Sequence, residues 1–256
     1  MTMTTASVSG SARGARIAVA LAWSGLVLAL ACGAGELLAG LGYRWGWWNF
    51  RSGIQIMRWS ATTDLAAVVL ALVAALLVWK YGTRRAFVAS AAGLVLSLIV
   101  AGPPLYYWRT VDRVPRIHDI STDTDNPPRY VAVLPLRKGA ENPADYSAEV
   151  AALQKKAYPD VAPAMLALPP AQALQRAERA ARALGWEIVA VAPDDLRIEA
   201  TDTTLLFGFK DDIVVRVTPS GSGSRVDLRS LSRVGKSDFG VNANRIRKFL
   251  RQLEGV

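Results

Sequence analysis

Hydrophobic and polar positions divide the chain into two parts near Trp108. Before this residue, three long stretches carry no charged side chain; after it, charged residues are interspersed with short apolar runs. The first uncharged run, residues 17–35, would cover about 28 Å as a helix, close to the hydrocarbon thickness of a bilayer. Within a membrane region of 17–108, we predict three transmembrane helices at about 17–38, 62–80 and 86–105, after a tail of residues 1–16.

The second and third helices are less regular than the first. The uncharged run 65–79 is short for a span, so it crosses the membrane only if Asp64 caps its start and Lys80 reaches the interface. The alternative is a re-entrant or interfacial helix. Pro103 and Pro104 are expected to end the third helix, because proline cannot donate the i→i−4 hydrogen bond.

Small residues recur every four positions in the first helix, at Gly25, Ala29 and Gly33. We expect this stripe to pack within the three-helix unit, with a dimer face as the alternative. Aromatic residues in 43–50 are typical of an interface belt, and a lipid or quinone contact is the alternative. No charge lies in the middle of a span, so the pattern indicates no ion or proton pathway.

Orientation in the membrane depends on basic residues that are almost evenly divided between the two sides. The second loop, 80–85, is the shortest and the densest in positive charge, which favours its placement in the cytoplasm. We therefore expect a cytoplasmic N-terminus and a soluble domain on the outer side of the membrane.

The soluble part, residues 109–256, is long enough for one domain with its own core. Its first segment, 109–168, is rich in Pro, Asp and Asn and predicts an extended arm or linker. Within this arm, 130–136 could form a strand and 143–158 a helix.

A compact core is expected from residue 169 to residue 256. Pro169 and Pro170 open a helix that ends at Gly185, and a terminal helix buries Ile246 and Phe249. Short connections between the intervening strands make the sheet antiparallel, with both helices on one face, and so predict an α+β class. The four or five expected strands lie at 186–191, 196–200, 205–209, 213–217 and 225–232.

Net charge gives little support for a nucleic-acid partner. Residues 109–256 hold 22 Lys/Arg and 19 Asp/Glu, a net of +3, whereas residues 1–108 hold 8 and 2, a net of +6. The positive charge comes mostly from residues that flank the membrane, so we expect membrane lipid and no nucleic acid as partner. The single cysteine, Cys32, excludes an intrachain disulfide.

The common catalytic and cofactor motifs are absent from the sequence. A single histidine, His118, excludes a multi-histidine metal site, and no nucleophile elbow, zincin or P-loop motif occurs. We therefore assign no catalytic residue and no cofactor. Asp119, Asp123 and Asp125 are weak metal candidates, because clustered carboxylates suit calcium; turn formation by the same side chains is the alternative.

The densest group of polar residues lies between Phe209 and Arg251. Arginines aligned on one face of the strand 225–232, close to the start of a helix, suit an anion or a charged partner. The structural alternative is that Asp211, Asp212, Asp227 and Asp238 pair with them and fix the last helix to the sheet. The anion- or partner-binding candidates are Arg229, Ser230, Ser232, Arg233, Asp238, Asn242 and Arg245.

The segments Phe207–Asp212 and Arg229–Asn242, followed by Arg245, resemble the bacterial and plastid family called domain of unknown function 1499. The resemblance covers roughly residues 115–254, and its R-S-x-S-R-x-G-x-S-D-x-G-x-N core is fairly specific. The opening 118–128 is similar to that of membrane-anchored members and lacks the cysteine pair of many others, so a role of those cysteines does not transfer. The resemblance implies an envelope or thylakoid-lumen setting and no established activity.

Three functions are compatible with these patterns. The first is a non-catalytic envelope module that binds an anionic lipid, a glycan or an envelope protein. The second is a hydrolase or transferase that uses Asp211, Asp212 and Asp238. The third is an accessory subunit of a larger membrane complex.

Overall fold

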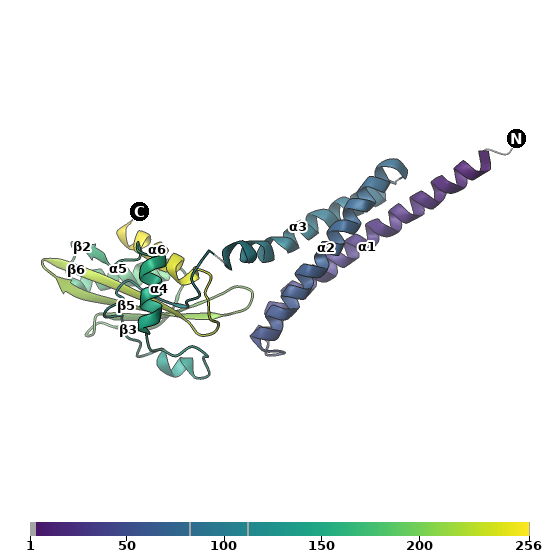
Figure 1. Ribbon diagram of the computed structural model, residues 1–256. Helices are drawn as coiled ribbons and strands as arrows, with labels where there is room; N and C mark the ends of the chain where they lie inside the picture. The colour runs from purple at the N-terminus through teal and green to yellow at the C-terminus, as the bar shows by residue number, and fades with distance from the viewer. Residues whose placement is uncertain (1–3, 82, 112, 256) are drawn as a thin grey trace. The chain divides into compact units, whose positions relative to one another are not determined.

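The computed structural model describes residues 4–81, 83–111 and 113–255, so residues 1–3 of the predicted tail lie outside the description. Figure 1 shows long helices from the N-terminal part and a sheet with helices from the C-terminal part. The chain forms two compact units. One comprises Met1–Arg109 with Leu206–Gly208, and the other Thr110–Leu205 with Phe209–Val256.

Three long helices form the first unit: α1 (Thr4–Arg44), α2 (Phe50–Tyr81) and α3 (Arg84–Val111). All three contain a stretch long and apolar enough to cross a membrane, including α2, whose uncharged run is the shortest. α1 begins at Thr4, so most of the segment expected to be a tail is helical. This segment has no proline that would interrupt the helix between Thr4 and Arg16.

Pro103 and Pro104 lie inside α3, so the prediction that they end the helix is wrong. Each proline removes one donor from the ladder, but helices in membranes tolerate this loss where neighbouring helices or local adjustment satisfy the backbone. Helical hydrogen bonding continues to Val111.

The small residues of α1 pack within the three-helix unit, as expected. A Cβ on Gly25 would lie 3.2 Å from the Ala71 backbone nitrogen of α2, and one on Gly33 would lie 3.2 Å from a Val100 methyl of α3. Ala29, between them, is fully buried. Larger side chains here would force the helices apart.

The expectation that no charge lies in the middle of a span requires correction. The helices extend beyond the uncharged runs, and the candidate spans Ala12–Arg44 and Phe50–Lys80 include Glu36 and Asp64. Both carboxylates are buried among the helices.

The second unit is built around an antiparallel sheet in the order β1-β6-β5-β4-β3, with β2 also paired to β6. The α+β prediction is confirmed, and the sheet includes two short strands that lie outside the predicted core. These are β1 and β2, which come from the predicted arm and pair with successive parts of β6. The strands are β1 (Asp119–Ser121), β2 (Ala164–Leu166), β3 (Glu187–Ala192), β4 (Arg197–Thr203), β5 (Lys210–Ser220) and β6 (Gly223–Ser232).

The longest strands, β5 and β6, are joined by the Ser-Gly-rich loop expected to form a hairpin. Ser220 pairs with Gly223, and Gly221 adopts a φ of 57°, which glycine reaches without strain. The strand expected at 205–209 is instead the connection between β4 and β5. Thr204 and Phe209 close this connection, because the Thr204 N–H donates to the Phe209 carbonyl at 2.9 Å and Gly208 has a φ of 67°.

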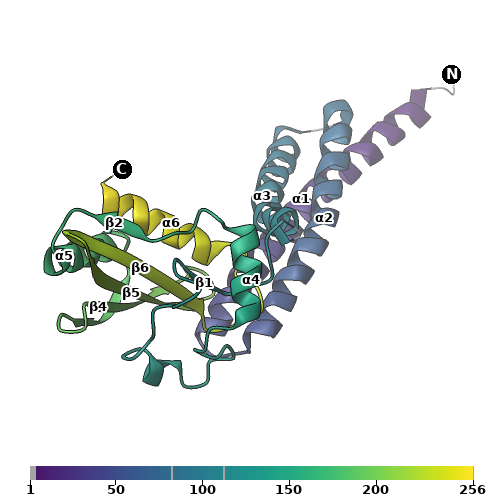
Figure 2. The same ribbon diagram turned by 60° about the vertical axis from the view of Figure 1, so that its left-hand side comes forward.

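Two helices cover one face of the sheet, α5 (Pro170–Ala183) and α6 (Val241–Glu254) (Figure 2). Ile213 and Val215 of β5 share a core with the apolar faces of both helices. Trp186 stacks on Phe249, with ring centroids 5.3 Å apart, and joins the start of β3 to α6.

The opposite face is covered by the arm, which also contains α4 (Ala148–Ala157). Tyr130 and Val133 pack against Val214 and Leu231, whose side chains leave the sheet on this side. The strand expected at 130–136 does not form; the segment bends into a 3-10 helix, η1 (Leu134–Arg137). One reason is that the amides of residues 131–133 donate to the Glu199 carboxylate and not to a neighbouring strand.

Candidate functional site

Strand β6 separates the predicted site residues onto two faces. Arg229 points to the face covered by the arm, where it meets Asp119 and Tyr130. Ser230 and Ser232 point to the other face, where both contact Asn242 of α6. The alternation predicted for this strand is therefore correct, but both faces are buried and neither is open to solvent.

Arg229 is held on the arm side by a carboxylate and two aromatic rings. Its Nε and Nη2 donate to the two Asp119 oxygens at 2.9 and 2.6 Å, and Nη2 also donates to the Ala144 carbonyl at 2.7 Å. The guanidinium lies 4.9 Å from the Tyr130 ring centroid and 5.2 Å from that of Tyr146. Only 3% of the Arg229 surface is exposed, so its guanidinium group is buried among these internal partners.

Asp212, at the start of β5, is the centre of a second cluster. Arg233 donates to both Asp212 oxygens, from Nε at 2.9 Å and from Nη2 at 2.7 Å. Arg137 of η1 pairs with the same carboxylate, and the Thr201 hydroxyl donates to it at 2.9 Å. Asp212 is fully buried, so two arginines and a threonine satisfy its charge inside the domain.

Arg245 links α6 to the ends of β4 and β5. It donates to Asp202 from Nε at 2.9 Å and from Nη2 at 2.8 Å, and to Asp211 from Nη2 at 2.7 Å. Its Nη1 lies 3.1 Å from the Ser230 hydroxyl and also bonds the Asn242 side chain. The predicted residues Ser230, Ser232, Asn242 and Arg245 thus form one hydrogen-bonded network that fixes α6 to the sheet.

Asp238 does not form the ion pair with an arginine that was the alternative to anion binding. Its two oxygens accept the Gly240 and Asn242 N–H groups, each at 2.8 Å, at the start of α6. Gly240 has a φ of 80°, the left-handed conformation that glycine adopts readily. Burial raises the pKa of Asp238. The Asp-x-Gly-x-Asn part of the sequence motif therefore builds the turn that starts the helix.

The three aspartates of the proposed metal loop are each bound within the protein. Asp119 holds Arg229, while Asp123 Oδ2 contacts Arg216 and Arg225 at 3.2 and 2.9 Å. Asp123 Oδ1 also accepts the N–H groups of residues 125 and 126, a turn that the sequence allowed as the alternative. Asp125 pairs with Lys155 at the surface. Within residues 4–81, 83–111 and 113–255, no group of three or more His, Cys, Asp and Glu side chains could hold a metal ion.

Glu199 is the principal buried charge that sequence reasoning missed. It alternates along β4 with the buried Ile198 and Ala200, yet only 1% of its own surface is exposed. The carboxylate accepts three successive backbone N–H groups, from Val131, Ala132 and Val133, at 3.0 to 3.1 Å, and the Nε–H group of Arg197 at 2.9 Å. The amides lie 66 to 68 residues away in sequence, so local periodicity carries no signal for this contact.

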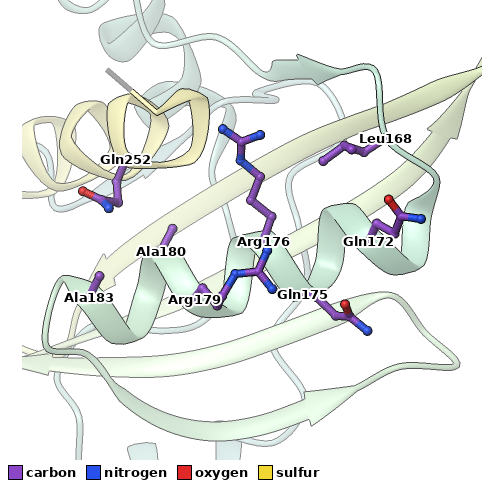
Figure 3. A pocket seen from close by; sticks show the side chains of 8 residues that line it. All are labelled: Leu168, Gln172, Gln175, Arg176, Arg179, Ala180, Ala183 and Gln252. Carbon is purple, nitrogen blue, oxygen red and sulfur yellow. The ribbon is translucent and has the colours of Figure 1, made fainter.

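An exposed groove of about 700 Å³ lies along α5, away from these clusters (Figure 3). Arg176 and Arg179 bring two positive charges to it, and its remaining polar lining consists of neutral glutamines. Among the residues that the structure describes, neither arginine takes part in an ion pair or hydrogen bond. The lining residues are Leu168, Gln172, Gln175, Arg176, Arg179, Ala180, Ala183 and Gln252.

These features define a membrane protein in which three candidate spans precede an α+β domain with an internally neutralised charge network. Residues 119–253 match the model of the family described as "Protein of unknown function (DUF1499)". This match covers more than half of the 256 residues, so the chain belongs to that family, as its sequence motifs indicated. No curated protein and no solved structure matches the chain significantly.

Proposed function

We propose that the protein is a non-catalytic binding or assembly module of the bacterial cell envelope, anchored by its three helices. One observation carries this proposal: Arg176 and Arg179 line an exposed groove without internal partners, whereas the arginines of the family motif are neutralised inside the domain. The binding role moves accordingly from Arg229, Arg233 and Arg245 to the groove on α5.

The engagement of the acidic residues supports a binding role over catalysis. A general base or nucleophile needs an accessible atom within reach of a substrate. Asp211 and Asp212 are instead bound by arginines, and both Asp238 oxygens accept backbone N–H groups. A hydrolase or transferase centred on these carboxylates would have to break the contacts that hold α6 and η1 in place.

The chemistry of the groove favours an anionic ligand. Two guanidinium groups one helical turn apart can each donate to phosphate or carboxylate oxygens, and glutamines supply neutral donors beside them. Because the domain is tethered to a membrane, lipid headgroups are present at high effective concentration. An anionic phospholipid headgroup is therefore the proposed ligand.

Thermal unfolding of the full-length protein in neutral detergent tests this proposal. A ligand that binds only the folded state raises the midpoint as its concentration rises. We expect phosphatidylglycerol, but not phosphatidylcholine, to raise the midpoint of the wild type, and Arg176→Gln with Arg179→Gln to abolish the shift. Arg182→Gln is the matched control, because Arg182 lies on the same helix and already pairs with Glu178. Equal shifts in the wild type and the double variant would contradict the proposal.

The proposed setting places the α+β domain in the periplasm and the N-terminus in the cytoplasm. The dense positive charge of the loop between α2 and α3 supports this orientation. A reporter that is active only outside the cytoplasm, fused after Val256, should be active. Activity of a cytoplasmic reporter at the same position would reverse the orientation.

A further inference from the structure

Two carboxylates lie inside the three-helix unit, in stretches apolar enough to cross a membrane. Glu36 is in α1 and Asp64 in α2, within the candidate spans Ala12–Arg44 and Phe50–Lys80. Asp64 is fully buried, and Glu36 is 9% exposed. An ionised carboxylate in such surroundings is costly unless it is paired, which makes an acidic residue here a candidate for function and not for solubility.

Neither carboxylate has a neutralising partner. Both Asp64 oxygens and the Glu36 Oε1 atom are buried without a hydrogen-bond partner among the described residues, and no lysine or arginine of this part of the chain pairs with them. The soluble unit is different, since its buried aspartates are held by arginines or by backbone amides. The hydrogen-bonding capacity and the charge of Glu36 and Asp64 are therefore not satisfied by the described residues.

Polar groups from all three helices meet at this place. Glu36 and Asp64 are close enough to interact electrostatically, and Cys32, one turn before Glu36, interacts with both. Ser97 of α3 is fully buried and lies near enough to Asp64 for its hydroxyl to favour the charged carboxylate, although no hydrogen bond within 3.5 Å joins the two side chains. Carboxylate oxygens buried without a donor at bonding distance indicate that a donor is missing, because buried polar groups are normally satisfied.

The number of protein oxygens limits which ligand can bind here. Calcium takes six to eight oxygen ligands, more than two carboxyl groups and one hydroxyl supply, and magnesium would have to bring several waters into this buried place. Two neighbouring carboxylates repel each other when both are ionised, and a single proton between them removes one charge and creates a donor. We propose that Glu36 and Asp64 form a proton-binding site inside the three-helix unit, with Ser97 completing its hydrogen bonds.

The three helices thus bind a proton in addition to anchoring the soluble domain. This role does not depend on the groove on α5. A proton held by the pair leaves one negative charge on the two carboxyl groups, which the Ser97 hydroxyl can stabilise by donating to the ionised oxygen. This is a binding site built from side chains of three helices, not a continuous pathway across the membrane.

Infrared spectroscopy of the full-length protein in neutral lipid vesicles tests the site. We expect the carbonyl stretching band of a protonated carboxyl at neutral pH, and its disappearance in the double variant Glu36→Gln, Asp64→Asn. The single variants should shift or weaken the band, which keeps the test valid if the double variant folds poorly. Asp194→Asn, at an exposed turn of the soluble unit, is the control and should leave the band unchanged.

Three results would overturn the proposal. They are a wild type without the band at neutral pH, a double variant that retains it, and loss of the band when sodium is added at constant pH. The last result would assign the site to a metal cation.

Discussion

Arg229 of β6 and Asp119 of β1 form a bidentate ion pair, with hydrogen bonds of 2.9 and 2.6 Å, and both side chains are almost completely buried. The pair joins the arm to the sheet. It also explains the first arginine of the family motif, which neutralises a carboxylate 110 residues earlier in the chain.

Arg229→Met should destabilise the domain strongly, because it leaves the Asp119 charge buried without a partner. Breaking a buried pair from one side costs about 3 to 5 kcal/mol. Removing both charges, in Arg229→Met with Asp119→Leu, should recover much of this loss. Denaturant unfolding of the full-length protein measures both variants.

The control for this experiment is Arg182→Met, since Arg182 and Glu178 form an exposed pair on α5. Such surface pairs contribute about 0.5 kcal/mol or less. If Arg229→Met lowered the free energy of unfolding by no more than Arg182→Met, the conclusion that Arg229 stabilises the domain through a buried ion pair would be wrong.

Glu199→Gln should loosen the segment 131–133. An amide oxygen can accept some of the N–H groups that the carboxylate now accepts, but without its charge, so each bond weakens. We expect faster hydrogen exchange at the amides of Val131, Ala132 and Val133, and a loss of about 1 to 3 kcal/mol in the free energy of unfolding. Glu187→Gln, at an exposed position on β3, should change neither. Unchanged hydrogen exchange at these amides in Glu199→Gln would contradict the conclusion that Glu199 holds the segment 131–133 in place.

Alkaline pH should destabilise the domain through its buried tyrosines. Burial raises the pKa of Tyr158 to about 12, with a further contribution from the charge of Asp238. An unfolded tyrosine titrates near pH 10, so the stabilising contribution of neutral Tyr158 is complete below about pH 10 and is lost as the pH rises toward its folded pKa. Tyr158→Phe should therefore flatten the fall in unfolding free energy over this range. Identical pH profiles of the two proteins would contradict this assignment.

Local pattern was sufficient to predict the α+β class, the two helices on one face and the β5–β6 hairpin. These depend on apolar periodicity, on Pro170 at the start of α5 and on the glycines at 221 and 223, all signals carried by neighbouring residues. Pro103 and Pro104 were misleading because the rule that proline ends a helix holds in water, where the unpaired carbonyls find other partners.

Contacts between residues that are distant in the sequence could not be predicted from such local patterns. The prediction that 130–136 forms a strand was wrong because the amides of this segment bind Glu199, and nothing near either segment indicates this contact. The candidate site shows the same limit. Arg229 lies on the face of β6 that the alternation indicated, but its burial depends on an arm whose packing no local pattern predicts.

The proposed binding role of the groove is tested most directly by hydrogen exchange of the full-length protein in nanodiscs, with phosphatidylglycerol compared with phosphatidylcholine. We expect the anionic lipid to protect the backbone of α5 around Arg176 and Arg179 in the wild type and in Arg182→Gln, and not in Arg176→Gln with Arg179→Gln. Protection that is absent from α5, or that persists in the double variant, would contradict the proposal that this groove binds an anionic lipid.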